Sequence, residues 1–161
     1  MNNPLSSAND YATFIHDLPN RYSAIQGSSL VYIPLGAKVG KVMGMIFFDR
    51  HIILCVQEIL NFELHVIEGY GYEVSQSQTE AEELPKAEEY CRASYPDKNK
   101  LYWYDSFPHP NDPTLASTHP HHKHIHPNIK RNRIPAPDIT FTAPNLSFLI
   151  EEIEQTVLTS T

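Results

Sequence analysis

The alternation of apolar and polar positions divides the chain into a helix, a series of strands and a second helix. An apolar stripe with the spacing of an α-helix lies near the N-terminus and consists of Tyr11, Phe14, Ile15 and Leu18. Ser7, three positions before Asp10, resembles a helix cap, and Pro19 is expected to end the helix. We therefore predict a short amphipathic helix at this end of the chain.

Short β-rich runs replace the helical period between residues 23 and 74. They are separated by Gly, by Pro and by the reversal at Asp49–His51, which predicts antiparallel neighbours in a meander. In the last run, "HVIEGYGYEV", Gly69 and Gly71 project from one face and leave it bare. Two interpretations of this face are open: a terminal helix packs against it, or another molecule approaches the backbone there.

The second half of the chain is less regular and ends in a helix. Residues 75–100 form an acidic insertion or loop, "LYWYDSF" at Leu101–Phe107 has strand character, and residues 125–140 form a basic, proline-rich loop. The final apolar stripe again has helical spacing and consists of Leu146, Leu149, Ile150, Ile153 and Val157. The predicted fold is a single α+β domain over residues 1–161, with an antiparallel sheet of about five strands and an N-terminal and a C-terminal amphipathic helix packed on it.

Composition supports one globular domain, because 161 residues with 41% hydrophobic content can bury a core. No apolar run approaches the roughly 20 residues of a membrane-spanning helix, and the N-terminus lacks the pattern of a secretory signal. We therefore expect a soluble, cytoplasmic protein with no membrane contact. Cys55 and Cys91 match no metal or redox spacing and are predicted to be two separate thiols; nothing in the sequence requires a disulfide.

The charge of the chain is uneven. A net charge of −7 argues against indiscriminate nucleic-acid binding. Residues 119–137 nevertheless contain no carboxylate and carry four cations, namely Lys123, Lys130, Arg131 and Arg133. This local patch leaves room for a specific anion.

Histidines are concentrated in one segment, with six of the nine between His109 and His126. If "HPHHKHIH" is extended, one face of the strand carries His122, His124 and His126. His-x-His can chelate zinc or nickel, and Asp105, Glu58 or His109 could supply a further ligand. No cofactor other than such an ion is predicted.

A second interpretation of this segment is metal-independent acid–base chemistry on a phosphodiester, because imidazole titrates near neutral pH. The catalytic candidates are Asp105, which would orient an imidazole, and His109, His119, His121, His122, Lys123 and His124. The residues expected to contact the substrate are Glu58, Tyr70, Tyr72, Tyr102, Tyr104, Lys130, Arg131 and Arg133. Among them, Lys123 and Arg131 would stabilise phosphate charge, and Tyr102 and Tyr104 would stack on RNA bases together with Trp103.

A third interpretation makes the same segment a polar edge strand whose imidazoles bond to the backbone and to tyrosine hydroxyls. In a variant of this interpretation the histidine-rich edge binds a protein partner and performs no catalysis. The residues alone leave the three interpretations open.

The order of the motifs resembles the TumE-like family of toxin–antitoxin proteins. The pieces that carry the resemblance are "VQEI" (Val56–Ile59), "GYGYEV" (Gly69–Val74), "LYWYDSFPH" (Leu101–His109), "HPHHKH" (His119–His124) and "PNLSFLIEEIEQTV" (Pro144–Val157). The resemblance spans about residues 52–157 and departs from the family pattern at Trp103 and Ser106, where relatives carry arginine and asparagine. It implies a toxin that acts inside the cell and has a cognate antitoxin as its partner. RNA is the candidate substrate, and a homo-oligomer is compatible with the sequence.

Overall fold

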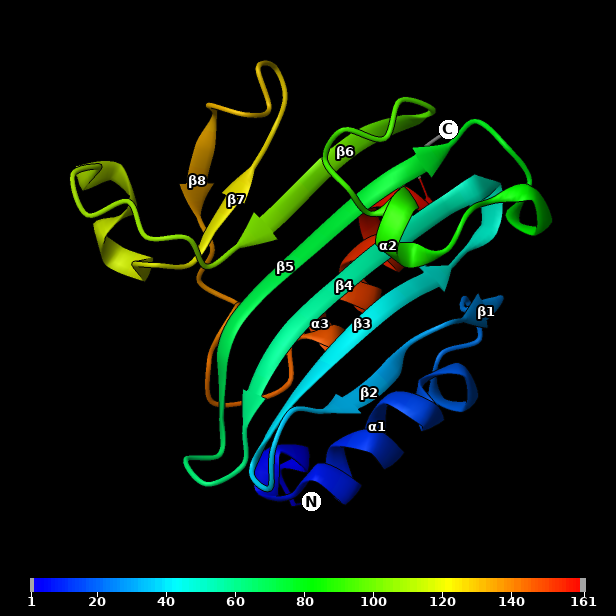
Figure 1. The fold of residues 1–161 in the computed structure, drawn as a ribbon. Helices are drawn as coiled ribbons and strands as arrows, with labels where there is room; N and C mark the ends of the chain where they lie inside the picture. Colours follow the sequence, from blue (N-terminus) through cyan, green and yellow to red (C-terminus); the bar gives the residue numbers. More distant parts are fainter. Residues whose placement is uncertain (1, 160–161) are drawn as a thin grey trace.

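The computed structural model describes residues 2–159 and is an α+β fold built on one antiparallel sheet (Figure 1). Within these residues the strands are β1 (Gly27–Ser28), β2 (Val31–Pro34), β3 (Val39–Phe47), β4 (Ile52–Asn61), β5 (Val66–Ser77), β6 (Lys98–Asp105), β7 (His122–His124) and β8 (Arg133–Pro135). Their order across the sheet is β1-β3-β4-β5-β6-β7-β8, and β2 also pairs with β3. The helices are α1 (Ala8–Arg21), α2 (Ala87–Tyr90) and α3 (Leu146–Glu152), which continues as a π-helix over Ile153–Val157. Turns of 3-10 helix lie at Pro4–Ser6, Asp49–His51, Ala81–Glu83 and Pro113–Thr118.

The sheet has more strands than the five predicted from the sequence. The long strands β3 to β6 correspond to the predicted runs, and the additional ones, β1, β7 and β8, have only two or three residues each. Such short segments cannot display the alternation that identifies a strand. Two of them lie in the histidine-rich segment and in the basic loop, so both regions belong to the edge of the sheet.

Helix α1 forms as the apolar stripe predicted, with Tyr11, Phe14, Ile15 and Leu18 all buried. The amide of Asp10 donates to Ser7 Oγ at 3.0 Å, so the predicted cap is confirmed. The expectation that Pro19 ends the helix was wrong, because α1 continues to Arg21. The amide of Tyr22 still donates to the Leu18 carbonyl at 3.0 Å, which closes one more turn.

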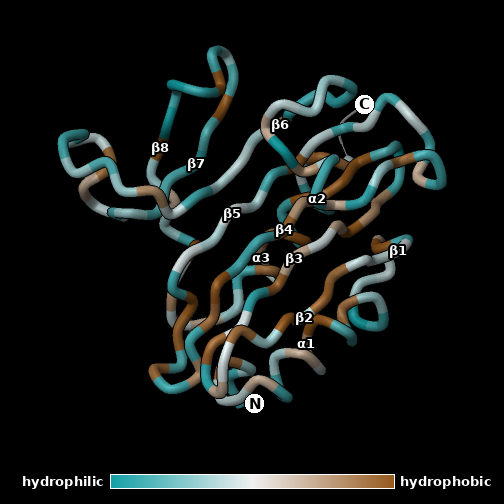
Figure 2. The backbone as a smooth tube through the Cα atoms, viewed as in Figure 1, coloured by the Kyte–Doolittle hydropathy of each residue, from teal (hydrophilic) through white to brown (hydrophobic). Residues whose placement is uncertain are grey.

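Helices α1 and α3 cover the same face of the sheet, and α3 is seen behind β3–β5 in Figure 1. Tyr11 of α1 donates to Glu58 of β4 at 2.7 Å, and Asn145, just before α3, donates to the Tyr72 hydroxyl of β5 at 3.2 Å. We call this the helix face of the sheet. Figure 2 shows apolar residues concentrated in β3 and β4 and polar ones in β7 and β8.

The alternation in β5 is interrupted by a β-bulge at Glu68, since Ile59 pairs with Gly69 and Leu60 pairs with Ile67. Strict alternation along this run, which places Gly69 and Gly71 on one face, would place Glu68 on the other face together with Tyr70. The bulge separates them: Glu68 is exposed, whereas Tyr70 is buried on the helix face. From Gly69 onward the predicted alternation holds.

The acidic insertion folds back over the other face of the sheet, which we call the open face. A small second core there contains Met45, Ile53, Cys55 and Tyr90, and α2 lies in front of the sheet in Figure 1. Cys55 and Cys91 form a disulfide that joins β4 to the residue after α2. The prediction of two separate thiols was therefore wrong, because a separation of 36 residues gives no sign that the insertion returns to β4.

No helix among residues 2–159 has the length and apolar character needed to cross a membrane.

Candidate functional site

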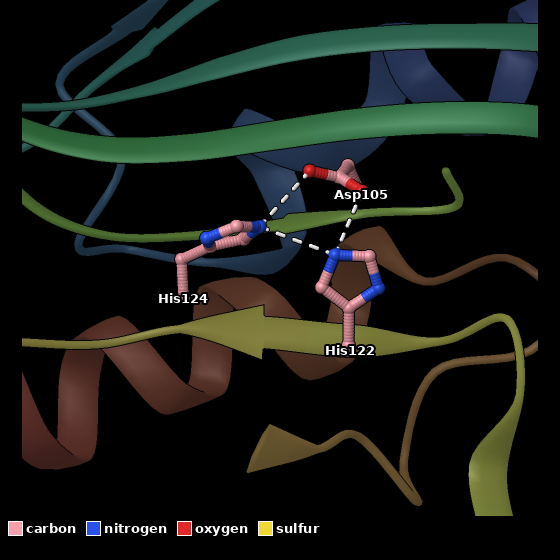
Figure 3. Close-up of side chains that lie close together, drawn as sticks. All are labelled: Asp105, His122 and His124. Atoms are coloured by element: carbon pink, nitrogen blue, oxygen red, sulfur yellow. Dashed lines mark hydrogen bonds and ion pairs between the residues drawn. The ribbon is translucent and has the colours of Figure 1, made fainter. Parts of the chain in front are cut away.

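Asp105, His122 and His124 lie together on the open face, where β6 pairs with β7. Asp105 is opposite His122 and Trp103 is opposite His124 in this register, so both imidazoles project on the same side as the carboxylate. His122 Nε2 lies 2.9 Å from Asp105 Oδ1, and His124 Nε2 lies 3.3 Å from Asp105 Oδ2 (Figure 3). The two Nε2 atoms are 3.1 Å apart. We call these three residues the Asp–His cluster.

The backbone fixes both imidazoles from the far side of each ring. His122 Nδ1 lies 3.0 Å from the carbonyl oxygen of Pro120, and His124 Nδ1 lies 2.9 Å from that of Ile129. A carbonyl oxygen can only accept a hydrogen bond, so each Nδ1 carries a proton and donates it. Each Nε2 is therefore directed at Asp105 and is the nitrogen with which the ring can exchange a proton or bind a metal.

The electrostatics of the cluster favour an ionised carboxylate beside a protonated imidazole. His122 is 1% exposed and His124 is 6% exposed. Burial would raise the pKa of Asp105, but hydrogen bonds from His122 and His124 outweigh it and hold that pKa well below its ordinary value. Burial would lower the pKa of His122, but its hydrogen bonds to Asp105 and to the Pro120 carbonyl raise that pKa overall.

His109 and Arg133 form the outer side of the cluster. The His109 ring packs edge-on against His122, with 4.8 Å between ring centroids, and Arg133 Nη1 lies 2.8 Å from His109 Nδ1. Burial and the charge of Arg133 lower the pKa of His109. Arg133 also lies 3.6 Å from Asp112, which offsets part of its charge. Two of the candidates from the sequence are thus brought to the cluster as neighbours of His122.

Lys123 lies on the opposite face of the sheet from the two histidines that flank it, because successive residues of a strand alternate. Its Nζ is 3.1 Å from Glu152 Oε2 and 4.2 Å from the centre of the Tyr102 ring. Tyr102 and Tyr104 are buried on this helix face. The side chains of Lys123, Tyr102 and Tyr104 thus lie on the helix face, away from the Asp–His cluster, and not where the expected contacts with phosphate and bases would need them.

Glu58, Tyr70 and Tyr72 also belong to the helix face and do not line the cluster, contrary to expectation. The fully buried Glu58 accepts hydrogen bonds from Tyr11 and Tyr72. Burial raises the pKa of Glu58 in spite of these two bonds. Tyr70 stacks on Tyr72, and its hydroxyl lies 2.7 Å from Nδ1 of His121, which takes His121 away from the cluster.

His119 and His126 flank β7, are exposed, and lie outside the cluster. His126 Nε2 lies 2.7 Å from the backbone carbonyl oxygen of Lys100. The third partner of the His122–His124 pair is therefore the carboxylate of Asp105 and not His126. Across residues 2–159, the Asp–His cluster is the single group of three His, Cys, Asp or Glu side chains whose ligand atoms converge in this way.

A groove of about 540 Å³ crosses the open face, and Asp105 is part of its lining. Gly44 and Gly71 also line it, and a Cβ added at Gly71 would meet nothing within 4 Å. The terminal helices α1 and α3 cover the other face. Of the two interpretations of the bare glycine face, packing of a terminal helix is therefore excluded, and the face is open to another molecule.

The groove is lined by four cations from four separate parts of the chain, namely Lys41, Arg92, Lys100 and Lys130. Of these, the sequence predicted Lys130 alone; Arg131, its neighbour, is exposed and is not part of the lining. The one signal that could have found Lys41 is strand register, because Lys41 pairs with Ile59 and Ile59 pairs with Gly69. Neither Arg92 nor Lys100 stands in any recognisable motif.

One wall of the groove is the insertion, and the Asp–His cluster adjoins the groove at Trp103. Cys91 and Arg92 line that wall, held against β4 by the Cys55–Cys91 disulfide. The Trp103 ring stacks on His124 with 4.4 Å between centroids, and Trp103 lines the groove. Glu73, a carboxylate of the lining, is paired with Lys98 at 2.6 Å. The arrangement combines a cationic surface with ligand atoms that can bind a proton or a metal ion.

The chain was compared with known proteins at the level of family, curated sequence and solved structure. Residues 20–157 match the model of the family described as Toxin TumE. This range contains every strand of the sheet, helix α3 and all residues of the cluster and the groove. No curated protein and no solved structure matches the chain significantly.

Proposed function

The chain belongs to the TumE toxin family, and from this premise we propose that it binds single-stranded RNA in the groove and cleaves it beside the Asp–His cluster. The family implies a cognate antitoxin as the partner that controls it. The proposal assigns substrate binding to the open face of the sheet and the reaction to the end of the groove at Asp105.

The observation that carries the proposal is the charge of the groove. The whole chain has 19 acidic and 12 basic residues, yet in the lining of this one groove four cations outnumber three carboxylates, Glu73, Glu88 and Asp105, of which Glu73 is paired with Lys98. Within the described residues, Lys41, Arg92 and Lys130 form no ion pair with a carboxylate of the chain. Clustered cations on an acidic protein favour a polyanion at that location and repel it elsewhere.

The shape of the groove favours a single strand. Proteins that bind single-stranded nucleic acid follow its backbone with a cationic groove on a sheet, and the bare backbone at Gly71 leaves such a strand room to approach. A phosphodiester that passes Asp105 would lie beside His122 and His124. Charge that develops on the phosphate during cleavage would then lie beside two buried imidazoles, whose interactions are stronger than those of groups in bulk water.

The first experiment separates binding from folding with two lysines of the groove. The Lys41→Ala/Lys130→Ala variant is compared with Lys38→Ala, which removes an exposed lysine outside the groove lining. We expect the double variant to bind a fluorescent single-stranded RNA about tenfold more weakly, with a flatter dependence on salt concentration. Lys38→Ala should bind as the wild type does.

The second experiment tests the reaction and the toxin role together. Induced wild-type protein should arrest growth and the purified protein should shorten the RNA, while Asp105→Asn should retain RNA binding and lose both effects. A wild-type protein that arrests growth but neither binds nor cleaves RNA would reject the proposal and favour a module that binds a protein partner.

A further inference from the structure

We infer that Asp105, His122 and His124 form a binding site for one divalent transition-metal ion, such as Zn²⁺. This site goes beyond the proposed action on RNA, and it stands or fails on ion binding alone.

The first argument is distance. The two Nε2 atoms lie 3.1 Å apart; that of His122 is 2.9 Å from Asp105 Oδ1, and that of His124 is 3.3 Å from Asp105 Oδ2. One ligand atom from each of the three residues lies within 4.8 Å of the other two. Ligands bound at about 2.0–2.2 Å to one ion in tetrahedral or octahedral geometry lie roughly 2.9–3.5 Å apart. Each Nε2 therefore already has, from the other Nε2 and from one oxygen of Asp105, the spacing that a shared ion imposes.

The second argument is the direction of the lone pairs. Because both Nδ1 atoms donate to backbone carbonyls, the nitrogen left for each ring is Nε2, and both Nε2 atoms are directed at an ionised carboxylate. One proton on His122 can reach both Asp105 and His124 only as a bifurcated hydrogen bond. A divalent ion among the three side chains would accept the lone pairs of both Nε2 atoms and of the carboxylate at once. Its charge of +2 would also more than neutralise the charge of −1 on Asp105.

The third argument is the support behind the ligands. Imidazoles that bind metals characteristically donate their other N–H to a backbone carbonyl or a carboxylate, which fixes the ring and strengthens the ligand. His122 and His124 do so to Pro120 and Ile129. The Trp103 ring stacked on His124 further limits rotation of that imidazole. Such support is absent from His119, which is exposed.

The ligand types restrict which ion fits. Two imidazole nitrogens and one carboxylate oxygen suit Zn²⁺ and its first-row neighbours, whereas Mg²⁺ and Ca²⁺ prefer oxygen ligands. Three ligands from the protein leave at least one position for water or another oxygen. Asp105 is the member of the cluster that lines the groove, so that position would be accessible to a ligand held there.

The test uses untagged protein stripped with a chelator and titrated with Zn²⁺ against a chromogenic competitor. We expect one equivalent of Zn²⁺ per chain, unaffected by millimolar Mg²⁺, and a Co²⁺ form whose visible absorption reports nitrogen and oxygen ligands. Asp105→Asn, which preserves the shape of the side chain, should weaken Zn²⁺ binding at least about tenfold. Its folding is checked by circular dichroism.

The matched control is His119→Ala/His126→Ala, which removes the two exposed histidines on either side of β7 and should leave the affinity unchanged. Loss of Zn²⁺ binding in this control with retention in Asp105→Asn would show adventitious chelation and overturn the inference. Wild-type protein that binds less than about a tenth of an equivalent would overturn it as well. Neither outcome involves RNA, so the ion site and the proposed function are tested separately.

Discussion

Lys123 Nζ lies 3.1 Å from Glu152 Oε2, across the contact between β7 and α3. The Tyr104 hydroxyl donates to the same carboxylate oxygen at 2.7 Å. The two ion-pair side chains are 20% and 13% exposed, so the pair is largely shielded from solvent. The lysine at the centre of the histidine motif thus attaches the C-terminal helix to the edge of the sheet.

The first prediction is that Lys123→Met lowers the free energy of unfolding and leaves RNA binding unchanged. Removal of the ammonium leaves the Glu152 carboxylate without its cation in a poorly solvated position, at a cost of about 1–3 kcal/mol. Urea unfolding measures the loss, and adding Glu152→Gln to the variant should recover part of it. Unchanged stability combined with weaker RNA binding would contradict this role.

The second prediction concerns the Cys55–Cys91 disulfide, which closes a loop across 36 residues and holds the insertion against β4. Reduction should lower the free energy of unfolding by about 2–4 kcal/mol, because the unfolded chain gains conformational freedom. Urea unfolding with and without reductant measures this difference. The Cys55→Ala/Cys91→Ala variant should be insensitive to reductant, and a wild type that is equally insensitive would refute the prediction.

The third prediction contrasts two glycines of the groove. Gly71 has open space where a side chain would project, so Gly71→Leu should fold with stability within about 1 kcal/mol of wild type. It should nevertheless weaken RNA binding about tenfold, because the leucine would occupy the groove. Fluorescence anisotropy with the RNA measures the effect, and Gly71→Ala, with a much smaller side chain, should lose less.

Gly44 is the counterpart in this comparison, because its φ is +144° and an added Cβ would lie 2.5 Å from the Ser29 carbonyl oxygen. Gly44→Ala should therefore destabilise the fold by about 1–3 kcal/mol or more. Equal stability of the Gly44 and Gly71 alanine variants would contradict the described backbone.

The fourth prediction is a pH dependence that originates in Glu58. Burial raises the pKa of this carboxyl above its ordinary value of 4.5. The contribution of the protonated Glu58 carboxyl to the free energy of unfolding is therefore fully present below about pH 4.5, and it is lost as the pH rises through the pKa of the folded state. Glu58→Gln cannot ionise, so its free energy of unfolding relative to wild type should increase between pH 4 and pH 8. A pH-independent difference would show that Glu58 ionises normally in the fold.

Elements with several turns or several alternations could be predicted from the sequence. The stripe of Leu146, Leu149 and Ile150 identified the face that α3 buries, and the two glycines of "GYGYEV" marked the bare face of β5. The family was also accessible from the sequence, because the order of short motifs is itself informative. Asp105, His122 and His124 were each site candidates, and the alternation of side chains along an extended strand already placed the two histidines on one face.

The remainder depended on pairings that no local pattern encodes. Lys123 stands between two candidate histidines, and its opposite orientation depends on the segment being extended, which the three-residue strand β7 establishes. The Cys55–Cys91 bond, like the presence of both Arg92 and Lys130 in the lining of one groove, requires knowing where the insertion folds. Glu58 was a candidate metal ligand and substrate contact from the sequence, but two tyrosine hydroxyls satisfy its carboxylate in the core.

Because side chains alternate along β7, the spacing of the residues in the histidine motif, and not only their types, decides which face of the sheet each side chain reaches. His122 and His124 project on the open face beside Asp105 while Lys123 faces α3, and a strand shifted by one residue would exchange these positions. A single inserted residue between Pro120 and His124 would then direct the ammonium at Asp105 and an imidazole at Glu152, although no side chain had been lost. Members of the family can therefore be sorted by the odd or even number of residues between the proline and the last histidine of this motif. A spacing that differs from that of this chain by an odd number of residues would identify chains that keep the residue types of the motif but place them on the wrong faces of the strand.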